Sequence, residues 1–284
     1  MIIITTVREM QDWANETRLQ GKRIGCVPTM GFLHKGHGSL ISKAAAECTE
    51  VVVTIFVNPT QFGPNEDFER YPRNFERDVE LAETCGATVI FHPTVSEMYP
   101  NHFSTTIHIS GVTDKFEGVF RPNHFNGVAT VVAKLLLATK PNIAYFGQKD
   151  YQQTLVIKRL VSDVNIDVEV SIQPTFREHD NLAMSSRNVY LSPEEREMAL
   201  VLSQALQTLQ RVISAGEKNR TILNNTLQQT IQQIPSAIID YANVALQETL
   251  HEPDVFNAGD SVVALLAVRI GKTRLIDNML FTMV

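Results

Sequence analysis

The type of fold is indicated by Arg23-Ile-Gly-Cys-Val27, followed directly by Pro28-Thr-Met-Gly-Phe-Leu-His-Lys-Gly-His-Gly-Ser-Leu40. Residues 23–27 form a short strand-like run, and apolar residues recur at helical spacing from Ser39 onward. The intervening residues are therefore predicted to form a strand-to-helix loop. Its glycines, Gly31, Gly36 and Gly38, allow sharp turns and close approach to a ligand.

The loop carries two imidazoles three residues apart, His34 and His37. A helix N-terminus presents unpaired N–H groups and the positive end of its dipole, which favour phosphate oxygens. A charged imidazole donates from both ring nitrogens, and a phosphate neighbour favours that form. The pattern therefore predicts a nucleotide phosphate site. A metal site is the alternative, but the other histidines form no close second pair and no Cys-x-x-Cys accompanies them, so no metal site is predicted.

Strand-like and helix-like segments alternate to about residue 172. This alternation predicts an α/β fold with a doubly wound, Rossmann-like parallel sheet, which binds ligands at the carboxyl ends of its strands. The predicted strands are 2–4, 23–27, 51–57, 87–91, 143–146 and 168–172. The predicted helices are 7–20, 39–47, 75–84, 128–139 and 151–162.

A different pattern begins after Pro174. Ser192 and Glu195 form a capping box around Pro193, and an apolar face continues to Gly216, which predicts one helix. A second helix is predicted from Thr221 to Ile234. Three strand-like runs follow at 238–246, 262–270 and 274–281. We expect residues 1–175 to form the Rossmann-like domain and residues 176–284 a smaller C-terminal α+β domain that acts as a lid.

The composition narrows the class of ligand. The 284 residues are 44% hydrophobic, enough for a buried core. A net charge of −6 argues against binding nucleic acid or anionic lipid. No apolar run approaches the roughly 18 residues that span a bilayer. The first seven residues are too short for a secretory signal, and three widely spaced cysteines suit a reducing compartment, so we expect a cytoplasmic protein.

Two further segments follow predicted strand ends. Asn58 and Gln61 come after the strand at 51–57, where neutral amides can hold a substrate's hydroxyl and carboxylate oxygens, although Asn-Pro is also a common turn. In 146–153, Gly147 allows close approach, Lys149 offers a charge to phosphate and Asp150 an acceptor to a ribose hydroxyl. A solvated helix start is the alternative for that segment. Gln153 would share the helix face of Lys149 and Asp150.

A third segment lies beyond the predicted domain boundary. Ser185, Ser186 and Arg187 form a candidate anion clamp able to close over a ligand, or else a polar turn. His124 is interpreted as structural and Arg121 as a weak candidate phosphate contact, and the role of both stays open.

Together these segments resemble the pantothenate synthetases, the pantoate–β-alanine ligase family of the nucleotidyltransferase superfamily. The resemblance spans nearly the whole chain. It rests on 28–31, His34-Lys-Gly-His37, 56–62, 121–125, 147–153, 184–188 and 274–278. His-x-Gly-His alone would identify only the superfamily.

The resemblance implies a two-step reaction. ATP and (R)-pantoate give pantoyl adenylate and pyrophosphate, and the amine of β-alanine then displaces AMP to give pantothenate. Such chemistry depends on positioning and charge stabilisation more than on an enzyme nucleophile. The family is usually a cytoplasmic homodimer, and Mg²⁺ would accompany the ATP.

Site residues are carried over by matching position. His37, the family's proton donor, His34 and Lys149 would be catalytic. Gln61 and Gln153 would bind pantoate, and Gln61 would also border β-alanine. The residues expected to bind ATP are Met30, Gly31, Phe32, Leu33, His34, Lys35, Gly36, His37, Gly147, Gln148, Lys149, Asp150, Phe176, Met184, Ser185, Ser186 and Arg187.

Three rivals stay open. A cytidylyl- or adenylyltransferase would share His-x-Gly-His but needs a basic acceptor site rather than Gln61 and Gln153. A nucleotide sensor would bind ATP without turnover. A fragment of a class I aminoacyl-tRNA synthetase fits less well, because the chain is acidic and lacks an anticodon-binding extension.

Overall fold

The computed structural model describes residues 1–64 and 66–284. The chain divides into two compact units, each described below by itself. The first comprises residues 1–148 and 152–174, and the second comprises residues 149–151 and 175–284.

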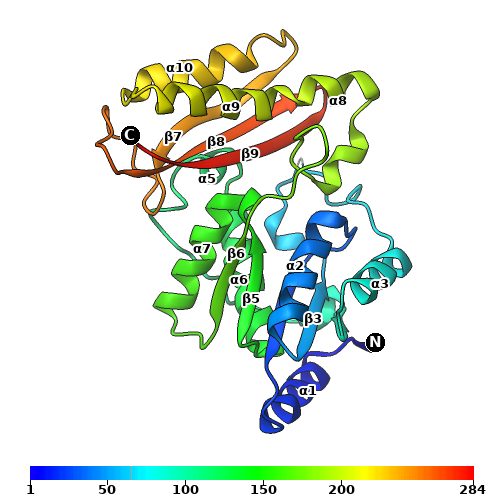
Figure 1. Cartoon of the computed structure of the whole chain (residues 1–284). Coiled ribbons are helices and arrows are strands. Elements are labelled where there is room, and N and C mark those ends of the chain that lie inside the picture. The colour runs from blue at the N-terminus through cyan, green and yellow to red at the C-terminus, as the bar shows by residue number, and fades with distance from the viewer. Residues whose placement is uncertain (65) are drawn as a thin grey trace. The chain divides into compact units, whose positions relative to one another are not determined.

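The first unit is built on a six-stranded sheet in the order β1-β4-β3-β2-β5-β6, in which every pairing is parallel (Figure 1). The strands are β1 (Ile2–Ile4), β2 (Ile24–Thr29), β3 (Glu50–Ile55), β4 (Val89–Phe91), β5 (Ile143–Gly147) and β6 (Glu169–Gln173). The order reverses between β2 and β5, which places a topological switch point beside the end of β2. The predicted doubly wound, Rossmann-like sheet is confirmed.

Helices cover both faces of this sheet (Figure 1). They are α1 (Val7–Leu19), α2 (Lys35–Glu47), α3 (Phe75–Thr84), α4 (Val95–Met98), α5 (Glu117–Phe120), α6 (His124–Thr139) and α7 (Tyr151–Asp163), with 3₁₀ turns η1 (Pro59–Gln61) and η2 (Gln148–Asp150). Along β3, Val52 packs with α1 and α6, while Val51 and Val53 pack with α2 and α3. Such two-sided burial explains the uninterrupted apolar sequence of this strand.

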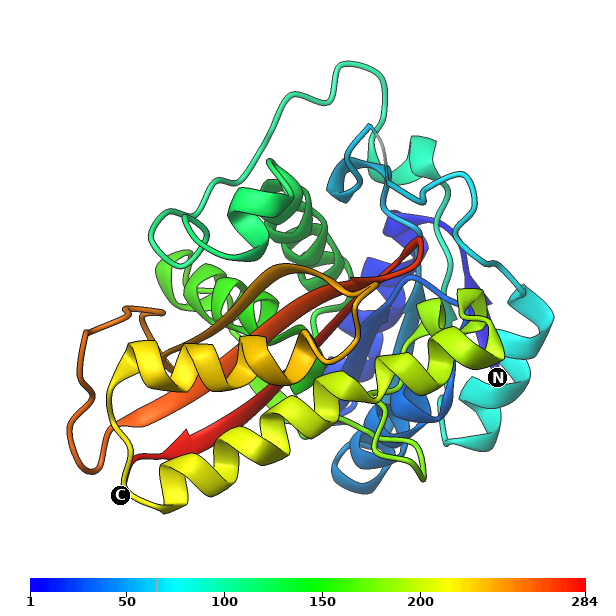
Figure 2. The same cartoon turned by 90° about the horizontal axis from the view of Figure 1, so that it is seen from above.

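The second unit has a three-stranded antiparallel sheet, β7-β8-β9. Its strands are β7 (Ile238–Leu246), β8 (Ser261–Ile270) and β9 (Thr273–Thr282), and its helices are α8 (Pro193–Ala199), α9 (Val201–Ser214) and α10 (Arg220–Ile231), with η3 (Ser186–Tyr190). Figure 2 shows α9 and α10 side by side along the sheet. The predicted smaller α+β architecture of the C-terminal part is confirmed.

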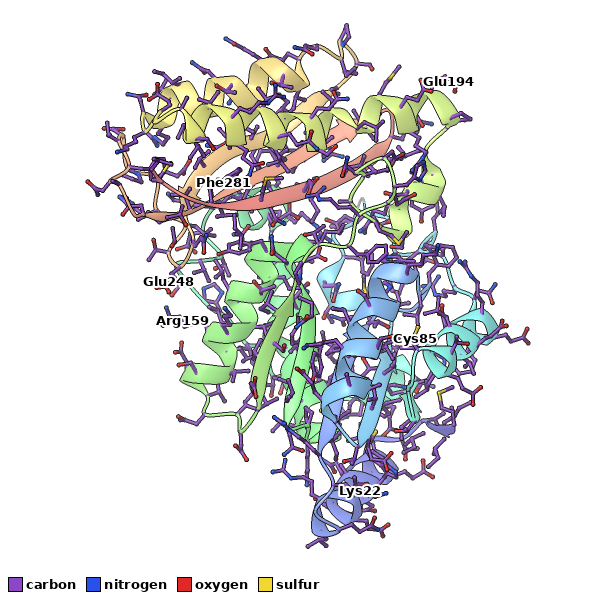
Figure 3. The ribbon with its side chains drawn as sticks, viewed as in Figure 1. Lys22, Cys85, Arg159, Glu194, Glu248 and Phe281 are labelled. Carbon is purple, nitrogen blue, oxygen red and sulfur yellow. The ribbon has the colours of Figure 1, made fainter. Side chains whose placement is uncertain are left out.

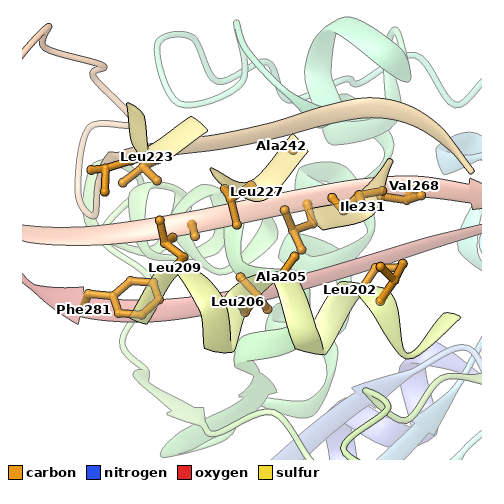
Figure 4. Packing of buried hydrophobic residues seen from close by; sticks show 14 of the residues in the cluster. Leu202, Ala205, Leu206, Leu209, Leu223, Leu227, Ile231, Ala242, Val268 and Phe281 are labelled. Carbon is orange, nitrogen blue, oxygen red and sulfur yellow. The ribbon is translucent and has the colours of Figure 1, made fainter. Parts of the chain in front are cut away.

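One apolar core holds this second unit together. Leu206 and Leu209 of α9 and Leu227 of α10 are fully buried against the strands, which contribute Val268 and Phe281 (Figure 4). Apolar residues three or four positions apart supply the stripe that this sheet face requires: Leu202, Leu206 and Leu209 on α9, and Leu223, Leu227 and Ile231 on α10.

Two element predictions need correction. The helix predicted from Ser192 to Gly216 is interrupted at Leu200, where the Leu200 N–H bonds to the Glu197 carbonyl, three residues back. The hydroxyl of Ser203 also donates to the Leu200 carbonyl at 2.9 Å, and such side-chain bonds compete with the helical ladder.

The helix predicted to begin at Ser39 instead begins at Lys35, with His34 as its N-cap. Gly36 and Gly38 are therefore helical residues, and of the loop glycines only Gly31 has a positive φ. Gly38 permits close packing rather than a turn, because a Cβ there would lie 3.0 Å from Cys85 Sγ. Cys85, labelled in Figure 3, caps the end of α3.

All three cysteines are free thiols. Across residues 1–64 and 66–284, no helix is both long and apolar enough to cross a membrane.

Candidate active site

The segment between β2 and α2 has a left-handed backbone held by a buried carboxyl group. Gly31 and Phe32 have φ of +80° and +48°, a backbone region that residues other than glycine seldom adopt. The two oxygens of Asp78, on α3, accept the N–H of Phe32 at 2.8 Å and of Leu33 at 2.6 Å. Consecutive N–H groups in such a conformation form a concave anion site. The Asp78 carboxyl group occupies that site, so these two N–H groups are already hydrogen-bonded and are not the ones expected to bind a phosphate.

Gly31 is required here for two reasons. Its φ is left-handed, and a Cβ at this position would lie 2.9 Å from Asp78 Oδ2. Burial raises the pKa of the Asp78 carboxyl, although the two backbone hydrogen bonds and the nearby charges of Arg77 and His92 oppose the shift. Asp78 was not singled out from the sequence, where it looks like one more polar residue on an amphipathic helix.

The two histidines lie at the start of α2, His34 as its N-cap and His37 in its first turn. Their rings stack with centroids 4.0 Å apart, and the His34 N–H donates to His37 Nδ1 at 3.3 Å. Because Nδ1 accepts this bond, neutral His37 carries its proton on Nε2. The two imidazoles thus stand side by side at the positive end of a helix, beside the switch point of the sheet.

Gln61 lies next to the same segment, in η1 after β3. Its Nε2 is 3.1 Å from Met30 Sδ, so the structure brings these two predicted site residues together. Its Oε1 accepts from Asn58 Nδ2 at 3.1 Å. The Gln61 amide is therefore held with its N–H group toward Met30.

Asn58 sets this orientation, and its contacts favour the alternative that Asn58-Pro59 forms a turn, because Asn58 caps η1. The Gly127 carbonyl can only accept, so Asn58 Nδ2 faces it, at 3.2 Å. Asn58 Oδ1 accepts from the Thr60 N–H and from Tyr99 Oη at 2.8 Å. With both ends engaged and only 1% of its surface exposed, Asn58 acts as the support of Gln61.

The first turn of α6 contacts the main chain of Gln61. His124 Nδ1 lies 2.9 Å from the Gln61 carbonyl oxygen, and Arg121 Nη2 lies 3.4 Å from it. Arg121 also forms a bidentate ion pair with Glu66, at 2.7 and 2.6 Å. Arg121 is thus engaged by a carboxylate in this structure, and His124 begins α6 rather than preceding it.

Gln153 is half-buried in the first turns of α7, and among the described residues its side chain forms no hydrogen bond. The neighbouring Gln152 is fully engaged: it donates to the Val112 and Lys115 carbonyls and accepts from the Glu117 N–H. Gln153, not Gln152, is therefore available to a ligand. Gly147 ends β5 and Gln148 begins η2, both in the same unit.

The remaining expected site residues belong to the second unit. The Lys149 carbonyl accepts from Asn278 Nδ2, on β9, at 2.8 Å, and Lys149 Nζ is 3.8 Å from Asp150 Oδ1. The Met184 N–H donates to the Phe176 carbonyl at 3.0 Å, which brings these two residues together. Ser185 caps η3 by accepting the Arg187 N–H, and Ser186 is buried.

Two neighbouring residues of β9 anchor these segments. Asp277 is 3% exposed and pairs with both terminal nitrogens of Arg177 at 2.8 Å, next to Phe176. Asn278 holds Lys149 as described above. Both residues belong to the family pattern at 274–278, but nothing in the sequence indicates these contacts. Only the pairing of distant elements reveals them.

A search of the described residues finds no group of three or more histidine, cysteine, aspartate or glutamate side chains placed to hold a metal ion.

A parallel doubly wound sheet with paired histidines at its switch point defines an α/β protein of the Rossmann-like, ligand-binding class. Residues 2–280 match the family model described as pantoate-beta-alanine ligase. The chain belongs to the pantoate–β-alanine ligase family and is an enzyme of that class.

Individual relatives agree. The pantothenate synthetase of Pelotomaculum thermopropionicum is 50% identical over 278 residues, 98% of each chain. The crystal structure of pantothenate synthetase from Thermus thermophilus has a TM-score of 0.92 and 44% identity, covering 98% of this chain and 99% of that one. The pantoate-beta-alanine ligase of Francisella tularensis, complexed with beta-gamma ATP and beta-alanine, has a TM-score of 0.81 and 36% identity, covering 99% and 97%.

Proposed function

We propose that this ligase joins (R)-pantoate to β-alanine through a pantoyl adenylate, consuming ATP and releasing pyrophosphate and AMP. A pantoate carboxylate oxygen attacks the α-phosphorus, and the bond from that phosphorus to the bridging oxygen breaks, so that pyrophosphate leaves. The amine of β-alanine then attacks the acyl carbon, AMP leaves with the oxygen that linked it, and the amine loses a proton. One observation carries this proposal. The Gln61 amide is held by Asn58 and directed to Met30, the first residue of the segment 30–37 that contains His34 and His37.

In the first unit, His34 and His37 would meet the phosphates, and the Nε2 proton of His37 would stabilise charge at the α-phosphate. Gln61 and Gln153 would hold pantoate oxygens, with Gln61 also bordering β-alanine. The expected nucleotide contacts in the second unit are Lys149, Asp150, Phe176 and 184–187. Mg²⁺ would enter on the ATP phosphates as part of the substrate.

Three broader predictions accompany this proposal and stay predictions: a nucleotide- and pantoate-binding part at 1–175 with a lid at 176–284, a homodimer, and a cytoplasmic location. The dimer is checked by light scattering of the purified protein.

The deciding experiment measures pyrophosphate release from ATP with and without D-pantoate, followed by addition of β-alanine. We expect release to require pantoate and AMP to appear only after β-alanine is added. Pantoate-independent release, or none from folded protein, contradicts the proposal. ATP binding without turnover would instead support a nucleotide sensor.

His37→Ala should lower the adenylation rate about 10²- to 10⁴-fold, the range for a positioned acid–base group. His251→Ala, which removes an exposed histidine, is the matched control and should leave the rate unchanged. Near-normal pyrophosphate release by the His37 variant would remove His37 from the mechanism.

A further inference from the structure

The main-chain carbonyl of Gln61 is held separately from its side chain. The side chain contacts Asn58 and Met30, whereas the carbonyl oxygen receives His124 Nδ1 at 2.9 Å and Arg121 Nη2 at 3.4 Å. A carbonyl has two lone pairs and can accept both bonds. The 3₁₀ turn that carries Gln61 is thus tied to the first turn of α6.

The protonation state of His124 follows from its partners. The Gln61 carbonyl can only accept, so Nδ1 carries a proton. Arg121 Nη1 lies 3.1 Å from Nε2 and can only donate, so Nε2 carries none. His124 is therefore neutral, with its proton on Nδ1, and links the guanidinium to the carbonyl. Burial and the charge of Arg121 lower the pKa of His124 to about 4, in agreement with this assignment.

Glu66 fixes the far end of this chain of contacts. Its two carboxylate oxygens receive Arg121 Nε and Nη2 at 2.7 and 2.6 Å, in the planar bidentate arrangement that orients a guanidinium. Burial would raise the pKa of the Glu66 carboxyl, but the hydrogen bonds and charge of Arg121 hold it below its usual range. Arg121 is therefore held in place before it meets His124 and Gln61.

The turn also rests directly on the backbone of α6. A Cβ at Gly127 would lie 2.4 Å from the Thr60 carbonyl oxygen and 2.7 Å from Gln61 Cα. Only glycine permits this approach, and the Gly127 carbonyl accepts from Asn58 Nδ2. Gln61 is thus supported by Arg121, which follows α5, and by His124 and Gly127 in the first turn of α6.

We propose that Glu66, Arg121 and His124 are positioning residues that set the pantoate-binding geometry by fixing the main chain of Gln61. This inference rests on the proposed binding of pantoate by Gln61. None of the three residues needs to touch a substrate to act in this way. The segment 31–33 is held by Asp78 instead, so the network should govern the KM for pantoate much more than the KM for ATP.

Two substitutions at His124 separate its two hydrogen bonds. The amide nitrogen of Asn can occupy the place of Nδ1 and keep the donor to the Gln61 carbonyl, whereas Gln reaches the place of Nε2 and loses that donor. We expect His124→Asn to raise the KM for pantoate less than about threefold, and His124→Gln about tenfold, the effect of one buried hydrogen bond. The KM for ATP should change less than about twofold in both.

A double-variant cycle tests whether His124 acts through Gln61. Gln61→Ala removes the side chain but leaves the carbonyl that His124 contacts. If His124 acts by positioning that side chain, His124→Gln should raise the KM for pantoate less than about twofold in the Gln61→Ala background. Multiplicative effects of the two changes would overturn the inference while leaving the pantoate role of Gln61 intact.

The proposed function fails in a different way. If Gln61→Ala alone leaves the KM for pantoate unchanged, Gln61 does not bind pantoate and the inference fails with it. His108→Asn is the matched control, because His108 is an exposed histidine whose ring contacts Asn126 of α6. It should behave as the unaltered chain.

Circular dichroism of every variant checks that the fold is kept. Equal KM values for pantoate in folded His124→Asn and His124→Gln would also contradict the inference.

Discussion

Two neighbouring segments of the first unit, 30–37 after β2 and 58–61 after β3, are held in place by different kinds of contact. The first has a left-handed backbone, and the buried carboxyl group of Asp78 accepts two of its N–H groups. In the second, the neutral side chains of Asn58 and His124 contact the side chain and the carbonyl of Gln61, and Arg121, paired with Glu66, reaches the same carbonyl. Both segments leave the carboxyl edge of the same parallel sheet.

The difference follows from what each segment must present. A segment that turns through left-handed conformations exposes consecutive N–H groups, and these need a strong acceptor. A glutamine that offers its N–H group to a ligand needs its amide held in one orientation. The Gly127 carbonyl, which can only accept, orients the Asn58 amide, and Asn58 in turn orients the Gln61 amide without any charged group. Burial raises the pKa of Asp78 and lowers that of His124, so it disfavours the charged form in both places.

The largest effect is expected from Asp78→Ala. Losing the acceptor of two buried N–H groups should lower the free energy of unfolding by about 4 kcal/mol, and Asp78→Asn by about half of that. The KM for ATP should rise more than the KM for pantoate, because the altered segment leads into His34 and His37. Urea unfolding and steady-state kinetics measure both effects.

Glu80→Ala, at an exposed position of the same helix, is the control and should change the free energy of unfolding by less than about 0.5 kcal/mol. An Asp78→Ala variant as stable as this control would show that the carboxyl group does not hold the segment.

The second largest effect is expected from acid, which should destabilise the contact between His124 of α6 and Gln61. Folded His124 takes up a proton only near its pKa of about 4, whereas the unfolded chain does so near the ordinary 6.5. Between these values the unfolded state binds more protons, so the free energy of unfolding falls as the pH drops from 6.5 to 4. The contribution of neutral His124 to stability is fully present above pH 6.5 and is lost by about pH 4. This contribution is about 3 kcal/mol at most.

The measurement compares the pH dependence of unfolding in the unaltered chain and in His124→Asn. The charges facing His124 are Arg121, Glu66 and Glu117, and all three remain in the variant. The variant should show a shallower fall across this window. Identical slopes would assign the acid sensitivity to other groups.

Gly127→Ala should have the smallest effect on stability, about 2 kcal/mol, the usual result of overpacking. A methyl group there meets the backbone of Thr60 and Gln61, so the turn must shift and the KM for pantoate should rise about tenfold with little change for ATP.

Gly63→Ala is the matched control, since a Cβ at Gly63 finds ordinary contacts with Glu66 beginning at 3.7 Å. Equal KM values for the two alanine variants would mean that the fit of the turn against α6 does not govern Gln61.

Much of the site is readable in the sequence because it is local. His34 and His37 share one helical turn, and Gln61 follows a strand whose apolar run is unmistakable. The start of α2 was predicted at Ser39 instead of Lys35, because Gly36 and Gly38 are typical loop residues. Gly38 is instead a helical residue that permits close packing against Cys85. The supports were missed because they join distant residues: Asp78 lies 46 positions from Phe32, and Asn278 lies 129 from Lys149.

By itself the sequence determined the alternation of strands and helices, the parallel sheet, the smaller α+β part and the local motifs. These follow from hydrophobic periodicity and turn chemistry, which act over a few residues. The folded chain alone shows that Asp78 accepts from the N–H groups of Phe32 and Leu33, and that His124 holds the Gln61 carbonyl. The physical reason is that a hydrogen bond depends on distance and direction in space, and packing alone brings such partners together.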